Sequence, residues 1–255
     1  MSSVKYFGHA LSGLLVVAFV VMIAFVVSFT PAQSVAQDNE RTFIQVRSVT
    51  VKGGMAGEYV ELQKQLTEAL EADGRPGRTV WQEIRGDLGT FHQVSTLDNF
   101  AANDEPFDPP MDEDAWDVWV DGVTNATQSS TRMILRTHPE YATSTVEGRE
   151  TNLLYLRYRT VDQGMMNDYH DWVENKLSPA LKEGGADVTW SHVVLGGNNR
   201  TWISATYLDK WAQMDGAGPL SHMSQDEIDA MLGVGADMVV ASENRLLRYR
   251  DDLSF

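Results

Sequence analysis

The sequence contains no cysteine, and this absence removes several classes of structure and chemistry. Without thiols the chain forms no disulfide, binds no zinc through thiolates and carries no cysteine nucleophile. Basic residues are also scarce, with 20 lysines and arginines against 36 aspartates and glutamates, which gives a formal net charge of −16. Because an acidic surface repels phosphate backbones, we expect no nucleic acid among the partners of this acidic protein.

Motifs of the common enzyme classes are missing as well. The chain has no glycine-rich phosphate loop, no Gly-x-Ser-x-Gly nucleophile elbow and no kinase signature. Its histidines lack the His-Glu-x-x-His spacing of a zinc site, so we expect no metal. No motif identifies a cofactor, and the sequence leaves open whether the protein is an enzyme.

A long hydrophobic run stands near the N-terminus. Residues 11–29 contain no charged side chain, Lys5 precedes them, and small residues follow at Ser34 and Ala36. This order is typical of a secretory signal peptide over residues 1–36, cleaved after Ala36. The alternative is an uncleaved membrane anchor, because such a run is long enough to span a bilayer. We therefore expect a periplasmic or secreted protein. The alternative is a membrane-anchored protein whose body lies outside the cytoplasm, and only the uncleaved segment would contact a membrane.

The rest of the sequence contains an internal duplication. Residues 43–59 and 153–169, which lie 110 positions apart, share six identities, and Arg47 is matched with Arg157. Two shorter matches follow along the chain in the same order and at nearly the same separation. Collinear matches of this kind indicate two copies of one structural unit.

Each copy has the same predicted order of elements: a strand, a helix, two strands of a hairpin, a second helix and a last strand. In the first copy these fall at 43–51, 55–73, 79–85, 89–97, 110–123 and 132–136, and in the second at 153–161, 165–183, 187–195, 200–208, 224–232 and 244–250. The order β-α-β-β-α-β is the ferredoxin-like motif. We therefore predict an α+β protein with two tandem ferredoxin-like repeats. The linkers and repeats are expected at 37–41, 42–140, 141–151 and 152–255.

The third strands of the two copies end alike, with Leu97-Asp98-Asn99-Phe100 and Leu208-Asp209-Lys210-Trp211. With the tandem element order, this pattern resembles the dimeric α+β barrel superfamily, which includes antibiotic-biosynthesis-type monooxygenases and NIPSNAP-like proteins. The resemblance covers residues 42–255. It implies that the two sheets pack into an α+β barrel, within the chain or with another copy as a homo-oligomer. It also implies a small molecule held between sheet and helices, and haem is a possible cofactor through the resemblance alone.

Arg47 and Arg157 are the first candidates for a ligand site. They occupy equivalent places in the middle of two strands, and with period two they share a mixed face with residues such as Tyr155. We expect the opposite, apolar face around Val46 to pack under the helices. The mixed face would line a cavity for an anionic or aromatic ligand, because arginine offers a planar fork of donors. The alternative is that each arginine pairs with a carboxylate such as Glu83.

Four more residues complete the candidate cavity. His92 and His192 are expected on neighbouring strands of the two copies, where a histidine could act as a general base or bind haem. Trp81 and Trp190 begin corresponding strands. The alternative for all four is ordinary packing, which aromatic side chains often serve. The sequence thus predicts an exported small-molecule-binding protein; the alternatives are a cofactor-free monooxygenase or haem-handling enzyme in the same cavity, and a scaffold or interaction protein.

Overall fold

The computed structural model describes residues 42–143 except 105 and 107, and then residues 151–215 and 218–255. The expected signal peptide or anchor lies outside these residues. None of the helices within them is long and apolar enough to cross a membrane. The main elements are β1 Phe43–Val51, α2 Ala56–Ala72, β2 Thr79–Arg85, β3 Thr90–Leu97, α3 Glu113–Ala126, β4 Thr127–Thr137, β5 Leu153–Val161, α4 Met166–Trp172, α5 Ser178–Glu183, β6 Val188–Leu195, β7 Thr201–Leu208, α6 Gln225–Asp237 and β8 Val239–Tyr249.

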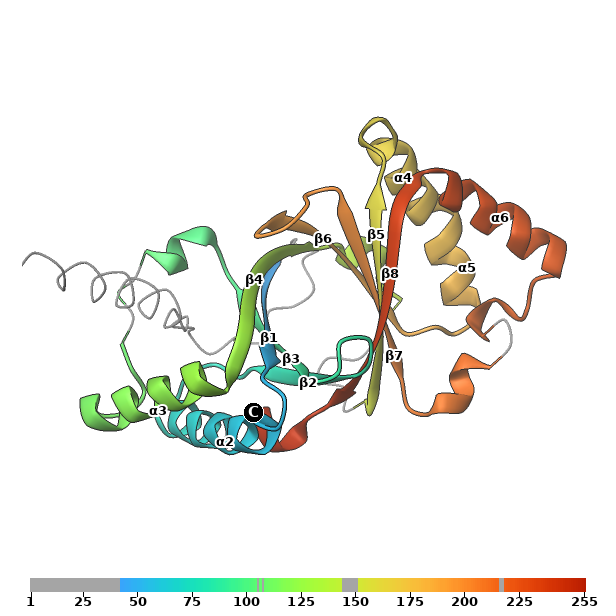
Figure 1. The fold of residues 1–255 in the computed structure, drawn as a ribbon. Coiled ribbons are helices and arrows are strands. Elements are labelled where there is room, and N and C mark those ends of the chain that lie inside the picture. The colour runs from blue at the N-terminus through green and yellow to red at the C-terminus, as the bar shows by residue number, and fades with distance from the viewer. Residues whose placement is uncertain (1–41, 105, 107, 144–150, 216–217) are drawn as a thin grey trace, which may run out of the picture.

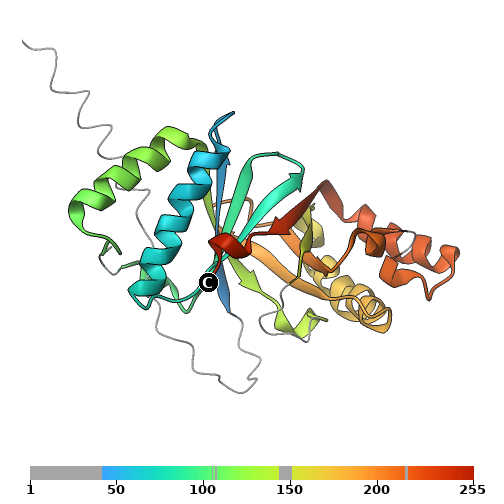
Figure 2. The ribbon, with the colours of Figure 1, turned by 90° about the horizontal axis from the view of Figure 1, so that it is seen from below.

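The strands form one closed antiparallel barrel in the order β1-β3-β2-β8-β5-β7-β6-β4. Each half of the chain supplies four adjacent strands, and the halves join where β2 pairs with β8 and where β4 pairs with β6. The barrel therefore closes within a single chain, which decides between the two arrangements left open by the sequence. The helices cover the barrel on two opposite sides, α2 and α3 on one and α4, α5 and α6 on the other (Figures 1 and 2).

Local signals in the sequence explain where the helices begin and end. Asp112 caps α3 by accepting a hydrogen bond from the backbone of Ala115, and Ser224 forms with Glu227 the capping box of α6. At the end of α2, Gly74 adopts a φ of 67°, a left-handed conformation that glycine adopts without a steric penalty. The last strands, β4 and β8, begin directly after their helices and are longer than predicted, because their first residues already pair with β1 and β5.

The two faces of the sheet pack against the opposite partners from those expected. Val46 and Leu156 point into the barrel lumen, where they pack with Trp81. The mixed face, which carries Arg47 and Arg157, lies beneath the helices. The assignment of the apolar face to the helices was therefore wrong. Barrel closure surrounds the lumen with strands and selects the apolar face for it, whereas the layer under the helices reaches solvent at its margins.

The segment after each last strand packs into the helix layer of the other half. Tyr141, which follows β4, belongs to the core under α4, and Leu253, which follows β8, belongs to the core under α2. The hydroxyl of Ser178 donates to the carbonyl of Tyr141 over 2.6 Å, and that of Thr67 donates to the carbonyl of Leu253 over 3.1 Å. Each half thus completes the core of the other.

Candidate functional site

In the first half, large side chains fill the space between sheet and helices. Trp116 and Trp119 of α3 stack with their ring centroids 4.8 Å apart, and both are buried together with Val123. The indole Nε1 of Trp119 donates to the carbonyl of Leu62 over 2.8 Å, which fixes α3 against α2. Aromatic side chains of this size account for much of the buried area of a core.

In the second half, the equivalent helix carries smaller side chains. The positions 112 residues after Trp116, Trp119 and Val123 hold an isoleucine, a methionine and Gly235. A Cβ at Gly235 would lie 2.5 Å from the ring of Trp172, so glycine allows this tryptophan to lie against α6. Two large rings of the first half are therefore absent from α6, and a pocket lies in the same layer of the second half.

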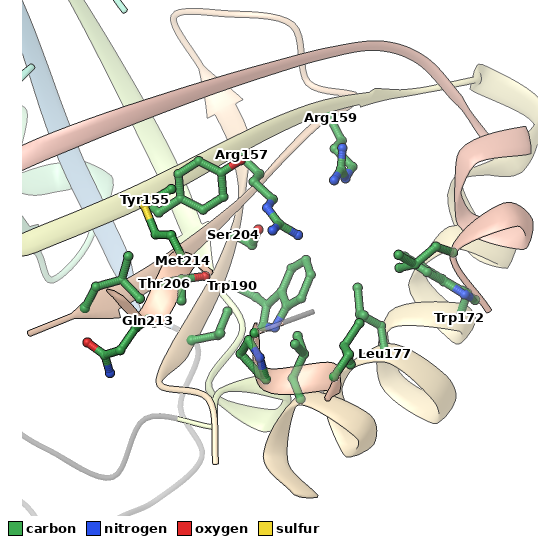
Figure 3. A pocket seen from close by; sticks show the side chains of 17 residues that line it. Tyr155, Arg157, Arg159, Trp172, Leu177, Trp190, Ser204, Thr206, Gln213 and Met214 are labelled. Carbon is green, nitrogen blue, oxygen red and sulfur yellow. The ribbon is translucent and has the colours of Figure 1, made fainter. Parts of the chain in front are cut away.

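This pocket lies between the sheet and the helices of the second half and has a volume of about 220 Å³. Its walls are formed by Tyr155, Arg157, Arg159, Trp172, Leu177, Leu181, Val188, Trp190, Ser204, Thr206, Leu208, Gln213, Met214, Gly218, Pro219, Leu220 and Leu232 (Figure 3). A more open groove of about 430 Å³ shares Arg157, Arg159, Trp172 and Leu232 with it, so the two spaces adjoin.

Two arginines give the pocket its charge. In the described part of the chain neither Arg157 nor Arg159 forms an ion pair with a carboxylate. Arg159 donates to the hydroxyl of Ser242 over 2.8 Å, and the guanidinium carbon of Arg157 lies 4.9 Å from the ring centroid of Tyr155. Figure 3 shows both side chains reaching from β5 toward the helices. Unpaired guanidinium groups on a chain of net charge −16 favour an anionic ligand.

Of two buried aromatic residues in this layer, Trp190 lines the pocket and offers it a donor, whereas Tyr169 lies beside the arginines without lining the pocket. Trp190 is 4% exposed, and its buried Nε1 has no hydrogen-bond partner among the described residues. A buried donor without an acceptor costs about 1–3 kcal/mol, a cost that an acceptor atom of a ligand would remove. Tyr169 lies near both arginines, and burial raises its pKa to about 12 against their opposing charge, so its hydroxyl keeps its proton.

Arg47, the counterpart of Arg157, has a different environment. It is only 9% exposed, and its Nε donates to the hydroxyl of Ser130 over 3.3 Å. Burial lowers the pKa of its guanidinium. The alternative expectation, a pair between Arg47 and Glu83, is wrong, because Glu83 points into the lumen on the other face of the sheet. Its carboxylate pairs with Arg245 over 2.5 Å.

Trp81 and His92 line the lumen, which contains a cavity of about 350 Å³. The Nδ1 atom of His92 lies 2.8 Å from the hydroxyl of Ser48, and its Nε2 atom lies 2.7 Å from Oε1 of Glu83. Burial by itself would raise the pKa of Glu83. The hydrogen bond from His92 and the charge of Arg245 outweigh this effect of burial and hold the pKa of Glu83 below its usual value. Glu83 is therefore a buried carboxylate, and Nε2 of His92 carries the proton of their hydrogen bond.

His192 lies in neither cavity. It is on the outer face of β6, where its Nδ1 atom is 2.8 Å from Nε2 of His138, whose ring stacks on Trp202 at a centroid distance of 4.7 Å. The expectation that His92 and His192 occupy neighbouring strands was wrong. The halves join through β2 and β4, whereas β3, which carries His92, lies between β1 and β2.

Trp81 and Trp190 begin corresponding strands but are one residue out of register. Trp81 pairs with His92, and Ser191 pairs with Ile203. Because His92 and Ile203 are equivalent, Trp81 corresponds to Ser191 and not to Trp190. A slip of one residue turns a side chain to the other face of a sheet. Trp81 therefore enters the lumen, and Trp190 lies under the helices.

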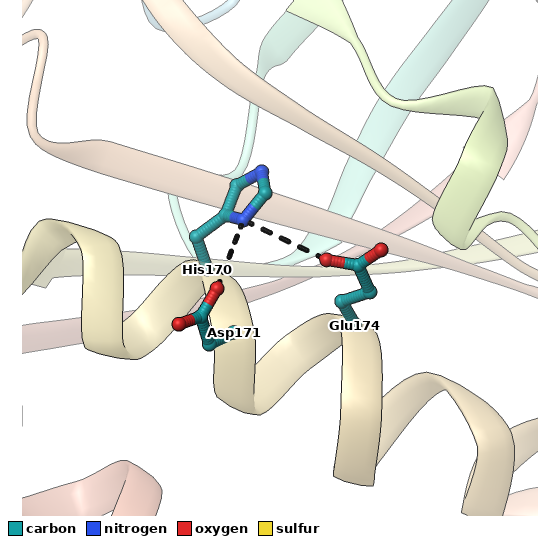
Figure 4. A group of neighbouring side chains, drawn as sticks. All are labelled: His170, Asp171 and Glu174. Atoms are coloured by element: carbon teal, nitrogen blue, oxygen red, sulfur yellow. Dashed lines mark ion pairs between the residues drawn. The ribbon is translucent and has the colours of Figure 1, made fainter.

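A half-buried His170 and the exposed Asp171 and Glu174 form a group on α4 and the helical turn after it (Figure 4). Nδ1 of His170 is 3.8 Å from a carboxylate oxygen of Asp171 and 4.0 Å from one of Glu174. Its Nε2 atom lies 2.5 Å from the hydroxyl of Tyr141. Exposed carboxylates are frequent on so acidic a surface, and we assign no metal to this group.

The predicted site residues thus occupy four places rather than one cavity. Tyr155, Arg157 and Trp190 share the pocket of the second half, and Trp81 and His92 line the lumen. His192 contacts His138 on the outer face of β6, and Arg47 is buried in the first half. Sequence reasoning missed Arg159 and Trp172. The alternation along β5 could have identified Arg159, which lies two residues after Arg157 on the same face. The place of Trp172, just before the π-helical turn Val173–Leu177, has no comparable signal.

Comparisons with known proteins identify the fold. No protein-family profile and no curated protein sequence matches the chain. A provisionally assigned monooxygenase from Lactobacillus acidophilus NCFM matches with a TM-score of 0.56 at 13% identity, over 84% of this chain and 96% of that chain. One from Fusobacterium nucleatum matches with 0.56 at 13% identity, over 83% and 94%. An anthrone oxidase-like protein matches with 0.58 at 11% identity, over 83% and 92%. At such identities the matches show a shared fold alone.

Proposed function

Because the chain has the dimeric α+β barrel fold, with both halves of the barrel in one polypeptide, we propose that it binds a small, planar, anionic molecule between the sheet and the helices of its second half. One observation carries this proposal. Arg157 and Arg159 line a pocket with both polar and apolar walls, and neither has a carboxylate partner among the described residues. A ligand carboxylate would pair with these guanidinium groups, and an acceptor atom would satisfy Nε1 of Trp190.

The walls of the pocket favour a planar aromatic body. The rings of Tyr155, Trp172 and Trp190 supply flat apolar surfaces, and Leu177 and Leu181 close the side toward the helices. A cavity of about 150 Å³ holds one benzene ring. A pocket of about 220 Å³ therefore suits one or two fused rings, whose carboxylate can extend toward the adjoining groove.

A haem does not fit this pocket. Neither histidine nor cysteine, two of the usual axial ligands of haem iron, is among its lining residues. Its volume of about 220 Å³ is also below the roughly 300–1,000 Å³ typical of sites for drug-sized ligands, and a haem is larger than these. We therefore derive no role for haem at this site.

A second candidate is cofactor-free oxygenation of the bound aromatic molecule. The names of three structures with the same fold support it, since two are provisional monooxygenases and one is anthrone oxidase-like. A shared fold does not determine a reaction. Consumption of dissolved oxygen together with turnover of a bound aromatic substrate would identify this activity, whereas stable binding in air would leave the protein a binder.

The setting of this function is also part of the proposal. The basic, apolar and small residues of segment 1–36 support export, with the barrel in the periplasm or medium, or held outside the cytoplasm by an uncleaved anchor. The closed barrel needs no second chain to complete its sheet, so any homo-oligomer would form through other surfaces. We also propose that residues 42–140 and 152–255 are the two folding units of the chain.

The test is an equilibrium titration of the full chain with 2-naphthoate, a planar two-ring anion. Arg157→Gln removes one charged donor, and a hydrogen bond to a charged group contributes about 1.5–3 kcal/mol, so we expect a loss of affinity of about 10- to 100-fold. Arg248→Gln is the matched control, because Arg248 is exposed on β8 and does not line the pocket. Equal affinities of the wild type and Arg157→Gln, or equal losses in both variants, would contradict the proposal.

A further inference from the structure

We propose that the lumen of the barrel is a second ligand site, which takes an uncharged, mainly aromatic or hydrocarbon molecule with one polar group. The cavity there measures about 350 Å³ and lies on the opposite face of the sheet from the pocket under the helices. Its walls are mostly apolar and include an aromatic cluster. The ring of Trp81 lies 5.1 Å from that of Tyr249 and 6.4 Å from that of Tyr207, centroid to centroid.

The two ends of this cavity differ in polarity. Thr79, Thr137 and Thr189 line it at the end where β1, β2, β5 and β6 begin. Thr79 is exposed there, so these hydroxyls form a polar rim at the side that meets solvent. His92 and Tyr158 line the cavity toward the opposite end. A molecule that enters past the threonines would meet apolar walls first and polar groups last.

A buried network closes the inner end. His92 contacts Ser48 and Glu83, as described above, and Glu83 also accepts from Arg245 over 2.5 Å. The side chain of Glu83 has no exposed surface, and that of His92 is 3% exposed. Because each charge has a partner, the network offers fixed polarity without an unpaired charge.

The other junction between the halves shows that the barrel can close without this network. The network lies where the halves join through β2 and β8. At the other junction, between β4 and β6, strand register places Val193 at the position of Glu83, Ile203 at that of His92 and Met133 at that of Arg245. An apolar set thus serves the same structural purpose. Buried charges are costly to desolvate, so their presence at only one junction indicates a role beyond packing.

The chemistry of the walls defines the ligand class. Arg245 is held by Glu83 and by Glu243, the latter over 2.8 Å, so the described residues around the lumen offer no free cation to an anionic ligand. Tyr158 lines the cavity, and its hydroxyl makes no hydrogen bond with a described residue. Burial raises the pKa of Tyr158 to about 12, so the hydroxyl is a neutral donor. A cavity of about 150 Å³ holds benzene, so 350 Å³ accommodates a bicyclic molecule with one acceptor.

A pair of probes with one ring system separates the two sites. 2-Naphthol is uncharged at neutral pH and tests the lumen, whereas 2-naphthoate is anionic and tests the pocket of the second half. Ala205→Trp fills the lumen, because Ala205 lines that cavity and not the pocket. Arg157→Gln alters only the pocket. All variants are titrated as full chains, so any partitioning of a probe into the hydrophobic segment 11–29 is common to them and cancels.

We expect Ala205→Trp to weaken 2-naphthol binding at least tenfold and to leave 2-naphthoate binding unchanged, and Arg157→Gln to do the reverse. Retained 2-naphthoate binding also shows that Ala205→Trp is folded. If that variant does not fold, Tyr158→Phe serves instead: it should weaken 2-naphthol severalfold and leave naphthalene binding unchanged. The proposal is overturned if the wild type shows no saturable 2-naphthol binding, or if 2-naphthol affinity follows Arg157 and ignores the lumen variants.

Discussion

The junction between β2 and β8 allows a sharp test of how the barrel tolerates buried charge. Glu83→Val removes a carboxylate whose side chain has no exposed surface and which accepts from His92, Arg245 and the backbone of Asp87. His92 remains buried without its partner. Arg245 is 24% exposed and can regain part of its hydration. Breaking a buried pair costs about 3–5 kcal/mol, and the exposure of Arg245 places the expected loss near 3 kcal/mol.

The opposite junction supplies the matched rescue. Replacing Glu83, His92 and Arg245 together by valine, isoleucine and methionine copies Val193, Ile203 and Met133 from the same places in the barrel. Because apolar residues of similar volume often replace a buried charged network without loss, we expect the triple variant to unfold within about 1 kcal/mol of the wild type. The three single losses would then be strongly non-additive, as expected for residues in one network.

Equilibrium urea unfolding, followed by near-ultraviolet circular dichroism, measures these free energies for the wild type, Glu83→Val and the triple variant. The slopes of unfolding free energy against urea concentration should agree among the three proteins, so that differences in their midpoints report differences in stability. A triple variant less stable than Glu83→Val would refute the reasoning, because the charges would then be needed for packing. A loss below about 1 kcal/mol in Glu83→Val would show that the carboxylate is not held as its contacts indicate.

Two further predictions concern pH and the shape of the pocket. In the folded protein the pKa of Glu83 lies below its ordinary value of 4.5. The ionised carboxylate therefore stabilises the fold above pH 4.5, and this stabilisation is lost as the pH falls through the pKa of the folded state. The difference in unfolding free energy between the wild type and Glu83→Gln, measured in urea, should shrink below about pH 4.5. Gly235→Ala places a Cβ 2.5 Å from the ring of Trp172, so we expect a loss of about 1–3 kcal/mol on thermal unfolding and weaker 2-naphthoate binding. Gly233→Ala meets open space inside the same helix, so it should raise stability by about 0.5–1 kcal/mol and leave binding unchanged. Equal effects of the two variants would contradict this reasoning.

The order of elements was predictable because it depends on local signals repeated in two copies. Ser224 and Glu227 form a capping box that marks the start of α6. Tyr59 and Tyr169, which are matched between the copies, occupy equivalent buried positions and are each 1% exposed. Alternation along a strand such as β1 separates two faces correctly. It does not tell which face a closed barrel turns inward, because that depends on how two sheets meet, and so the face of Arg47 was assigned to the wrong side.

The site itself was only partly predictable. Arg157 was found because its match with Arg47 marked it, but the surroundings of the two arginines differ between the copies. The sequence shows that smaller residues stand 112 positions after Trp116 and Trp119, but this difference does not locate the pocket, which other residues line. The packing of Tyr141 into the other half's core depends on a long-range arrangement of the chain, for which the sequence has no local signal.

The most direct test of the central claim is the position of a bound anion in the molecule. A crystal structure of the full chain with 2-naphthoate should show the carboxylate within hydrogen-bonding distance of Arg157 or Arg159 and the rings against Trp190, in the pocket of the second half. Density for the probe in the lumen or on the outer surface, with that pocket empty at a saturating concentration, would contradict the account.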